Sequence, residues 1–472
     1  MNVLLINPRT DDMIGTELPS YIAKEVGRFP PLGLLYLAAA VRAGGRHAVR
    51  VVDMPATDTS YAELARELRR TAPDLVGVTG TTHNLVDILR TARCVKEAAP
   101  GLPVCLGGPH ADAYPREAAA EPDIDYVLRG EAERSFVRLL DALQDGTPCE
   151  DIPGLACVRG GRTRLNAPDA SNGELDGLPF PARDLVRTDD YFYVLGKRAT
   201  ITTLLSSRGC PYRCTFCSTP RGRYRVRSPE NIVAEMEACV AGGAREIHFV
   251  DDTFNAQRGR LRRVSRCLLD RGLPVAWSFR GRADTLEEGE LELAAQAGCV
   301  RMNLGVETGS DRGLERLRKG ITTADVERAL RWARRAGVTT AAYFMIGCPH
   351  EAKREDVLRT IDFACRAGPD FALFNILAIY PHTELHRQAE EKGLIDPSRW
   401  PAFVRAPRAD FELPFWEEFF DRGELSALLE TAYRRFYLRP SMIWRNLAAL
   451  RSVGELKHKA AAGLSILTGG KA

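Results

Sequence analysis

The amino-acid sequence predicts an α/β protein with an N-terminal doubly wound parallel sheet, a central partial (β/α)6 TIM-type barrel and a small helical C-terminal unit. Two observations predict this class. Short apolar runs alternate with helical patterns over residues 1–150, and the alternation resumes over residues 199–395. The chain has 472 residues, which is more than one hydrophobic core usually supports, so several domains are expected.

The first 150 residues carry the pattern of a doubly wound sheet. Apolar runs at 3–7, 49–53, 75–79, 104–107 and 124–128 predict buried parallel strands, with helices between them. The helix predicted over 61–70 opens with Ser60 and Glu63 at capping-box spacing. Such sheets bind ligands beyond the carboxyl ends of their strands. The residues at those ends are Asn7, Asp53, Thr79, Thr81, Thr82, Gly107, Gly108, Pro109, His110, Arg129, Gly130 and Glu131.

A connector with little regular structure is expected over 151–198, which is rich in Gly, Pro, Asp and Arg. Barrel strands are then predicted at 200–206, 246–250, 275–279, 302–306, 340–346 and 371–379. Active sites of such barrels lie at the carboxyl ends of the strands. Functional residues of this domain, 199–395, are therefore sought directly after each strand.

Aromatic residues crowd the C-terminal segment, 396–472, in a helical pattern. They suggest a domain on the substrate side and an apolar or ring-containing small-molecule substrate. The tail also carries basic residues that include Arg451, Lys457 and Lys459. Peripheral contact with a membrane is one interpretation of this basic stretch, and a solvated face packed on the barrel is the one we favour.

Composition excludes several classes of function. The formal net charge of +3 gives no sign of nucleic-acid binding. The content of 45% hydrophobic and 27% charged residues is that of an ordinary globular protein. The N-terminus lacks the pattern of a signal peptide, and no apolar run is long enough to span a bilayer. Only three of the twelve cysteines are clustered, which favours metal ligation over disulfides and predicts a cytoplasmic protein.

The most specific motif is Cys210-Pro-Tyr-Arg-Cys214-Thr-Phe-Cys217, directly after the first predicted barrel strand. Three thiols at C-x3-C-x2-C spacing can ligate three corners of a cubane iron–sulfur cluster and leave the fourth iron open. A structural zinc site or three unpaired thiols are the alternatives. Zinc would require a fourth Cys or His at matching spacing, and no second C-x2-C occurs in the sequence.

This motif, including Phe216 before the last cysteine, resembles that of the radical S-adenosylmethionine (SAM) superfamily. The resemblance implies a [4Fe–4S] cluster held by Cys210, Cys214 and Cys217, with SAM bound to the open iron. One electron from an external donor such as flavodoxin or ferredoxin would then cleave SAM to a 5′-deoxyadenosyl radical. The protein contributes binding, orientation and exclusion of water.

Further residues at strand ends match the same resemblance, which implies that they bind SAM. Asp251, Asp252 and Thr253 follow the second barrel strand, where a carboxylate suits the ammonium of methionine. Arg282 and Glu307 follow the third and fourth strands. The alternatives are a helix N-cap for Asp252 or Thr253 and a surface salt bridge for each of Arg282 and Glu307.

Two histidines replace glycines that relatives commonly have at strand ends. Gly347, at the fifth strand end, is expected to admit the adenosyl group, and His350 follows it in place of a second glycine. His382 stands where Pro-Gly-Thr is usual after the sixth strand. His350, His382 and the nearby Cys348 are candidate catalytic residues, and tolerated loop residues are the alternative we favour for the two histidines.

The N-terminal stretches Pro30-Pro-Leu-Gly-Leu34, Gly107-Gly-Pro-His-Ala111 and Val127-Leu-Arg-Gly-Glu-Ala-Glu133 resemble a Rossmann-like cobalamin-binding domain. Together with the barrel motifs, the resemblance covers residues 1–395 in the correct order. It implies that the strand ends listed above frame cobalamin, with His110 beside the corrin edge. The Asp-x-His-x-x-Gly signature of a cobalt-ligating histidine is absent. The alternative is a domain that retains the fold and binds nothing.

These resemblances identify the chain as a cobalamin-dependent radical SAM enzyme, similar to class B radical SAM methyltransferases and related to the anaerobic Mg-protoporphyrin monomethyl ester cyclase group. They imply methyl transfer to an unactivated carbon, or phosphorus, of a small-molecule biosynthetic intermediate. One alternative is cyclisation, rearrangement or oxidation without methyl transfer. The other is a non-catalytic cobalamin or iron–sulfur redox sensor.

Overall fold

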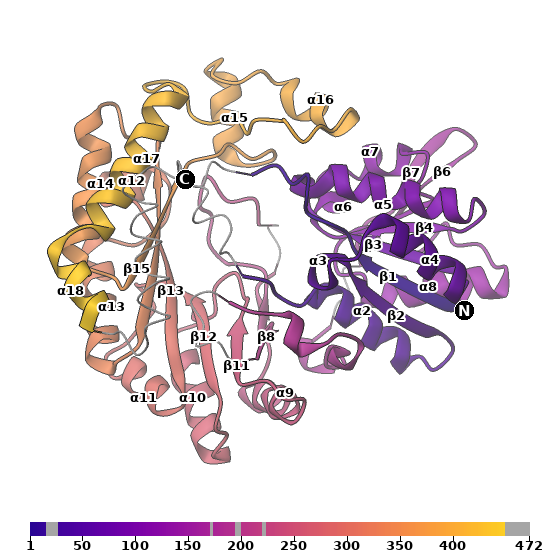
Figure 1. The fold of residues 1–472 in the computed structure, drawn as a ribbon, viewed down its shortest axis with the longest axis horizontal. Helices are drawn as coiled ribbons and strands as arrows, with labels where there is room; N and C mark the ends of the chain where they lie inside the picture. The colour runs from indigo at the N-terminus through magenta and orange to yellow at the C-terminus, as the bar shows by residue number, and fades with distance from the viewer. Residues whose placement is uncertain (16–26, 170–172, 194–199, 220–222, 449–472) are drawn as a thin grey trace.

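A computed structural model describes residues 1–15, 27–169, 173–193, 200–219 and 223–448. Two α/β halves lie next to each other, the N-terminal sheet on the right of Figure 1 and the barrel on the left. Both sheets and their helices confirm the predicted fold class. Among the described residues, no helix combines the length and the apolar character needed to cross a membrane.

The N-terminal sheet has seven strands in the order β2-β1-β3-β4-β5-β6-β7. The first five in sequence are parallel: β1 (Asn2–Asn7), β2 (Ala48–Asp53), β3 (Leu75–Thr79), β4 (Val104–Gly107) and β5 (Tyr126–Leu128). Because they are parallel, their carboxyl ends lie at one edge of the sheet. That edge faces the barrel in Figure 1.

Helices cover both faces of this sheet. One face packs against α2 (Leu32–Ala43) and α8 (Glu133–Asp145), and the other against α4 (Tyr61–Thr71) and α5 (Leu85–Ala98). The predicted capping box starts α4, because the Ser60 hydroxyl accepts from the Glu63 amide at 3.2 Å and Glu63 accepts in return. Short helices follow two of these strands: α3 (Met54–Thr57) follows β2, and α6 (Pro109–Ala113) and α7 (Pro115–Ala120) follow β4.

Two strands lie within the range expected to be an irregular connector. β6 (Leu155–Arg159) and β7 (Arg162–Leu165) form an antiparallel hairpin that extends the N-terminal sheet past residue 150. Gly160 and Gly161 join them, both with positive φ. A two-residue Gly-Gly turn of this kind is a hairpin signal. Composition alone marks this stretch as a loop, and it does not show that the flanking residues pair as strands.

The barrel is an open sheet of six parallel strands in the order β15-β14-β13-β12-β11-β8. Its strands are β8 (Ile201–Leu204), β11 (Glu246–Phe249), β12 (Ala276–Gly281), β13 (Cys299–Glu307), β14 (Thr339–Ile346) and β15 (Phe371–Ile376). A small antiparallel pair, β9 (Ser207–Arg208) and β10 (Arg225–Val226), brackets the cysteine motif. The pairing of β9 with β10 therefore holds together the two ends of the loop that carries the motif.

Helices pack on the outer face of the barrel. They are α9 (Pro229–Ala241), α10 (Arg260–Arg271), α11 (Glu290–Gln296), α13 (Thr323–Ala336), α14 (Arg354–Ala367) and α17 (Arg422–Tyr437). The remaining described helices lie near strand ends or at the C-terminus: α12 (Asp311–Arg316), α15 (Glu384–Glu391), α16 (Arg399–Arg405) and α18 (Pro440–Ala448). Ser228 caps α9 by accepting from the Asn231 amide at 3.2 Å.

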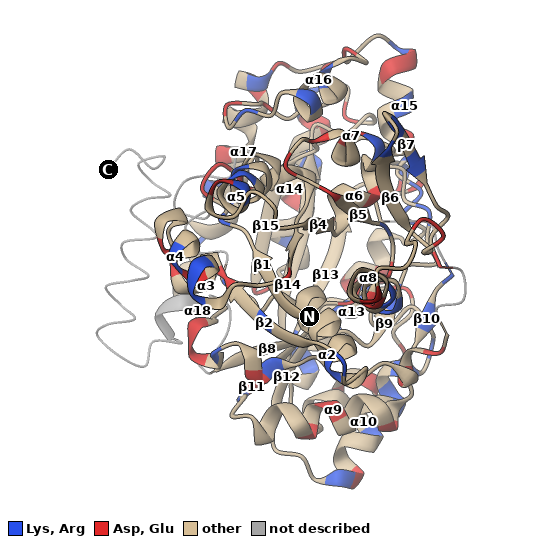
Figure 2. Cartoon of the chain, turned by 90° about the vertical axis from the view of Figure 1, so that its right-hand side faces the viewer, with Lys and Arg blue, Asp and Glu red and all other residues tan. Residues whose placement is uncertain are grey.

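The C-terminal segment is helical, as predicted, but its helices join two different cores. Trp400 and Phe403 of α16 pack into the core of the N-terminal half, whereas Tyr433 and Phe436 of α17 pack on the barrel. These aromatic side chains are buried, so they do not form a substrate surface. Arg451, Lys457 and Lys459 lie outside the described residues. Lys, Arg, Asp and Glu are interspersed over the elements visible in Figure 2.

Candidate active site

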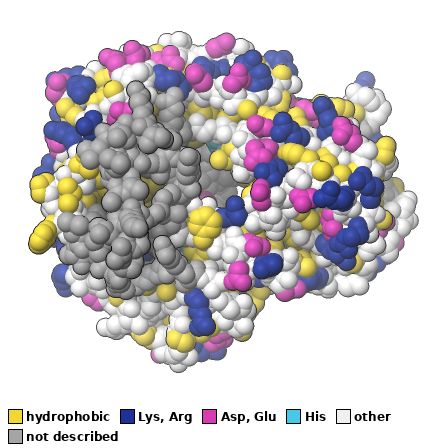
Figure 3. Space-filling view, in the orientation of Figure 1, with side chains coloured by type: hydrophobic (Ala, Val, Ile, Leu, Met, Phe, Trp, Pro, Cys, Tyr) yellow, Lys and Arg dark blue, Asp and Glu magenta, His cyan; other side chains and the backbone are white. Residues whose placement is uncertain are grey.

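A cavity of about 950 Å³ lies where the carboxyl ends of the two sheets meet. The N-terminal half contributes six predicted residues to its wall: Thr79, Gly107, Gly108, Arg129, Gly130 and Glu131. The barrel contributes Leu205, Ser207, Arg208, Gly209, Thr219, Val250 and Asp252. Figure 3 shows the face of the molecule on which the two halves adjoin. Sequence reasoning placed ligand-binding edges on both domains, and the structure joins them in one space.

Glycines on the N-terminal wall place no side chain in this cavity. Gly108 has φ of +90°, and a Cβ there would meet the Thr79 hydroxyl at 2.7 Å. At Gly107 the nearest atom to an added Cβ is a carbonyl oxygen at 3.7 Å, so the strand end is open. Behind it, an apolar recess reaches into the sheet, lined by Leu5, Leu34, Leu37, Leu128 and Phe136. Backbone edges beside an apolar recess fit a large, flat cofactor such as a corrin.

No histidine is found among the described residues that line this cavity. His110, expected beside the corrin edge, is instead buried at 1% exposure, with its Nδ1 3.0 Å from the Thr82 hydroxyl. Burial lowers the pKa of His110 to about 4, so the ring is neutral at pH 7. The placement of His110 as a corrin contact is therefore corrected. The described lining of the cavity contains no histidine, and the sequence contains no Asp-x-His-x-x-Gly signature.

Five other predicted strand-end residues also lie away from the cavity wall: Asn7, Asp53, Thr81, Thr82 and Pro109. Asn7 donates from Nδ2 to Asp53 at 2.8 Å, and Tyr191 donates to the other Asp53 oxygen at 2.8 Å. Thr81 forms a capping box with Asn84. These side chains satisfy one another and hold the loops after β1, β2 and β3. Pro109, at the start of α6, is likewise not among the lining residues.

The cysteine loop is fastened on both sides. The Thr215 amide donates to the Leu317 carbonyl at 3.0 Å, and the Thr215 carbonyl accepts from the Leu385 amide at 2.9 Å. Phe216 packs against an apolar cluster that includes Cys348 and Trp416. Cys210 and Cys214 are partly buried, and Cys217 is exposed. The loop is thus fixed between α12 and α15, and none of its three cysteines is in a disulfide.

Three cysteines on one loop fit a cubane iron–sulfur cluster, which leaves its fourth iron for another ligand. Among the residues that the structure describes, no three His, Cys, Asp or Glu side chains converge as ligands of one metal ion would. A cubane takes one thiolate at each of three irons, so its cysteines stand farther apart. Burial raises the pKa of the Cys214 thiol, and the nearby Lys319 and Arg282 cations oppose this shift. The three cysteines would hold the cluster.

Beside this loop lies a buried group of charges. Glu307 ends β13 at a register shift, with φ of +73°. Its Oε1 accepts from Lys319 Nζ at 2.6 Å. Such a conformation is costly for a residue with a side chain and is concentrated at functional sites. Lys319 was not anticipated, because only the fold brings it to Glu307.

Arg282 completes this group from the end of β12. It donates to the Lys319 carbonyl at 2.7 Å and to Asp284 at 2.9 Å. Its guanidinium lies 3.5 Å from the ring centre of Tyr212, inside the cysteine motif. Arg282 and Glu307 are only 4% and 8% exposed. The alternative of surface salt bridges is therefore wrong for both residues.

The three residues after β11 have separate roles. Asp251 is fully buried and accepts from the Ser206 amide at 2.6 Å and the Ser207 amide at 3.2 Å. It positions the chain before the cysteine motif and does not face the cavity, which corrects its assignment to SAM. Asp252 does line the cavity, and the Thr253 hydroxyl lies 3.6 Å from Cys210 Sγ. The N-cap alternative is wrong, because the next helix begins at Arg260.

The loop after β14 also differs from expectation. Gly347 has φ of +75°, but an added Cβ would meet Leu425 of α17 at 3.0 Å, so the glycine serves packing there. Cys348 is 1% exposed, and burial raises the pKa of its thiol well above the usual range. A buried neutral thiol is a poor nucleophile, so its catalytic assignment is corrected. Glu351 holds this loop by accepting from the Cys348 amide at 2.9 Å.

The two candidate histidines are both outside the wall of the large cavity. His350 Nε2 lies 3.1 Å from the Thr308 hydroxyl, and burial lowers the pKa of the ring to about 4. His382 is exposed and has φ of +63°. This left-handed conformation is one that glycine adopts readily. The ring centre of His382 is 5.2 Å from that of Tyr114 in the N-terminal half.

Ion pairs that sequence reasoning missed join the two halves at the cavity. Arg208 of β9 pairs with Glu131 at 2.7 Å and also with Glu133. Arg225 of β10 pairs with Glu131. Both arginines come from the strands that bracket the cysteine motif, so these contacts set its position relative to the N-terminal sheet. Local sequence gives no signal for such long-range partners.

Comparison with known proteins agrees with this site. Residues 204–379 match the radical SAM superfamily, and residues 20–140 match the B12-binding domain. An uncharacterised methyltransferase of Pyrococcus horikoshii is 33% identical over 95% of each chain. The anaerobic magnesium-protoporphyrin IX monomethyl ester cyclase of Cereibacter sphaeroides is 29% identical over 95% of this chain and 75% of its own. The cobalamin-dependent SAM radical enzyme OxsB has the same fold, with a TM-score of 0.73 at 17% identity, over 99% of this chain and 72% of its own.

Proposed function

We propose, from the premise that this chain belongs to the family of cobalamin-dependent radical SAM methyltransferases, that it methylates an unactivated carbon or phosphorus of a small-molecule biosynthetic intermediate. The observation that carries the proposal is the single cavity of about 950 Å³ between the two sheets. It reaches from the predicted corrin edge at Gly107 and Gly108 to Gly209, the residue before Cys210. Methyl transfer requires the methyl donor and the radical source to reach the same substrate atom.

The residues on the barrel side fit SAM beside the cluster. When bound, the cluster and SAM supply a 5′-deoxyadenosyl radical, and cobalamin supplies the methyl group. Arg282 and Lys319 provide cations beside Cys214, where a methionine carboxylate would bind. Glu307 and Asp252 provide carboxylates for its ammonium group. Glu307 and Lys319 pair with each other at 2.6 Å, so a carboxylate and a cation lie side by side, as the two charges of an amino acid require.

The inner face of the barrel is polar, which bears on the substrate. Trp277 and Phe279 of β12 pack in the helix-side core, so Ser278 and Arg280 point inward. Arg280 pairs in register with Asn303 of β13, whose buried side-chain amide has no hydrogen-bond partner. The C-terminal aromatics Trp400, Phe403, Tyr433 and Phe436 are buried, so they give no support to an apolar or ring-containing substrate. We propose instead a substrate with a polar or anionic group that reaches Arg280.

Ring formation or rearrangement without methyl transfer is the second candidate. Similarity over 95% of this chain to a monomethyl ester cyclase favours it. Both candidates use an external one-electron donor, for which flavodoxin or ferredoxin is our proposal. The sensor interpretation does not hold, because the chain belongs to a family of enzymes.

Product analysis separates the two candidates before the substrate is identified. The protein, reconstituted without oxygen, is given cobalamin, a one-electron reductant and SAM with a trideuterated methyl group. Methyl transfer predicts S-adenosylhomocysteine and trideuteromethylcobalamin, together with 5′-deoxyadenosine. If 5′-deoxyadenosine forms without S-adenosylhomocysteine, methyl transfer is contradicted and the ring-forming candidate is favoured. If neither product forms, both candidates fail.

A further inference from the structure

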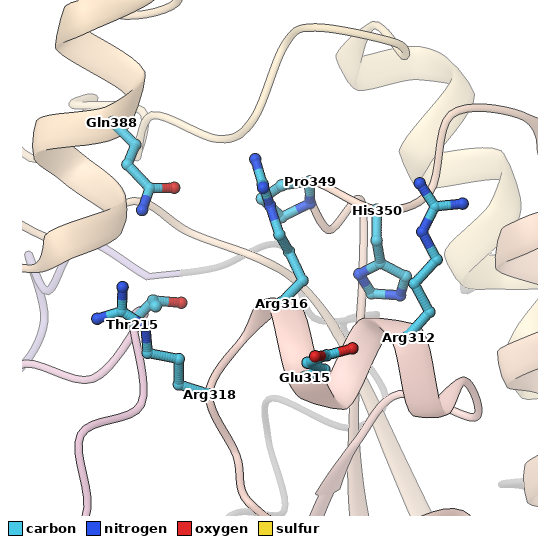
Figure 4. A pocket seen from close by; sticks show the side chains of 8 residues that line it. All are labelled: Thr215, Arg312, Glu315, Arg316, Arg318, Pro349, His350 and Gln388. Atoms are coloured by element: carbon cyan, nitrogen blue, oxygen red, sulfur yellow. The ribbon is translucent and has the colours of Figure 1, made fainter.

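A second pocket, of about 550 Å³, lies beside the cysteine loop and shares no lining residue with the large cavity. Figure 4 shows the side chains around it, drawn from α12, from the loop after β14 and from α15. Its lining residues are Thr215, Arg312, Glu315, Arg316, Arg318, Pro349, His350 and Gln388. Nothing in the proposed methyl transfer uses this pocket.

Positive charge dominates the pocket wall. Arg312 and Arg316 lie four residues apart on α12, so both project from one side of the helix. Neither forms a hydrogen bond or an ion pair with any residue that the structure describes. Arg318 follows with φ of +51° and pairs with Glu384 at 2.7 Å. Glu315 is the only carboxylate among the described lining residues.

Two lining residues also carry a polar atom without a partner. The hydroxyl of Thr215, a residue only 3% exposed, has no hydrogen-bond partner, and neither has Nδ1 of His350. Unpaired buried polar atoms are rare in proteins, and each requires an explanation. The backbone of Thr215 is fastened at 3.0 Å and 2.9 Å to Leu317 and Leu385, so this wall is firm.

We propose that this pocket binds a small ligand through a phosphate group. The planar forks of Arg312 and Arg316 match phosphate oxygens in pairs, and Arg318 adds a third cation. The volume of about 550 Å³ is that of a small-molecule site and exceeds what one phosphate fills. A phosphorylated metabolite or a nucleotide therefore fits better than a free ion. Through Thr215, between two of the cluster-binding cysteines, the ligand contacts the cysteine loop.

Calorimetric titration of the full-length protein with inorganic pyrophosphate, and separately with ADP, tests the proposal. We expect saturable binding of at least one of them, weakened at least tenfold in Arg312→Gln and in Arg316→Gln. Arg331→Gln, which removes an exposed arginine from α13, is the matched control and should bind as the wild type does. Tighter binding of ADP would identify a nucleotide, and tighter binding of pyrophosphate a phosphorylated metabolite.

Thr215→Val, nearly isosteric, should weaken binding about threefold or more while the protein remains folded, because it removes one hydroxyl. The proposal is overturned if neither ligand binds, or if Arg312→Gln and Arg331→Gln weaken binding equally. Equal competition by sodium chloride at matched ionic strength would also overturn it, since the effect would then be general screening. Capture of an acidic electron-carrier protein without pyrophosphate or ADP binding would show a protein-docking surface instead.

Discussion

At the scale of single residues, burial separates side chains that can react from those that support the loops. The cysteine trio could be predicted because its spacing is local and leaves few alternatives. Asp251 and Cys348 were assigned from their positions after strands, yet both are buried and serve the loops. Lys319 and Arg208 were missed because their partners lie far away in sequence. Strand-end position predicts proximity to a site, whereas the direction of a side chain depends on packing.

Replacing Cys348 tests this distinction. Cys348→Ala should leave the formation of 5′-deoxyadenosine from SAM within about twofold of wild type, because a buried neutral thiol takes no part in the chemistry. Single-turnover assays on reconstituted protein give the rate. A loss of a hundredfold with the cluster spectrum unchanged would restore Cys348 as a catalytic residue.

The buried pair of Lys319 and Glu307 is expected to bind SAM. Lys319→Met should raise the KM for SAM tenfold or more, which corresponds to about 1.4 kcal/mol or more of binding free energy. Lys319→Arg keeps the cation and should recover part of the loss. Cluster absorbance serves as the control for folding. An unchanged KM in Lys319→Met would remove this residue from the SAM site.

At the scale of elements, the alternation of strands and helices was predictable, whereas pairing across the chain was not. β13 is longer than expected. Polar residues on its inward side interrupt the apolar run near both ends of the strand, so a search for apolar runs finds only the middle. α17 covers β15 as the sixth outer helix, although sequence alone placed it in a separate unit. Local periodicity shows that a helix has an apolar face but does not indicate which sheet covers it.

The stability of the protein should depend on pH through Glu351, in the loop after β14. Burial raises the pKa of this carboxyl from its ordinary value of 4.5 to about 7. The folded chain therefore holds the proton more tightly than the unfolded chain does. This contribution to stability is full below about pH 4.5 and is lost as pH rises through 7.

The measurement is the difference in Tm between Glu351→Gln and wild type across pH 5 to 8. Because glutamine cannot ionise, wild type should lose Tm relative to the variant as pH rises. Parallel Tm curves for the two proteins would contradict the role given to Glu351.

At the scale of the whole molecule, the carboxyl ends of two sheets face one cavity, and ion pairs fix the position of one sheet relative to the other. Arg208→Gln leaves Glu131 and Glu133 without this partner at the domain junction. We expect faster hydrogen exchange in β9 and β10 and weaker retention of cobalamin on gel filtration. Arg46→Gln, which breaks exposed pairs with Asp141 and Asp145 within one half, is the control and should change neither. Identical hydrogen exchange and cobalamin retention in both variants would refute this role of the Arg208 ion pairs.

The central claim is that the cluster and cobalamin occupy the two ends of one cavity. Electron paramagnetic resonance of the protein loaded with both, with the cluster reduced and the cobalt as cobalt(II), tests it most directly. Two unpaired spins in the same cavity interact, so the cobalt(II) signal should relax faster in wild type than in Cys214→Ala, which lacks the cluster. Equal relaxation of the cobalt(II) signal in the two proteins, with both cofactors present in wild type, would contradict the account.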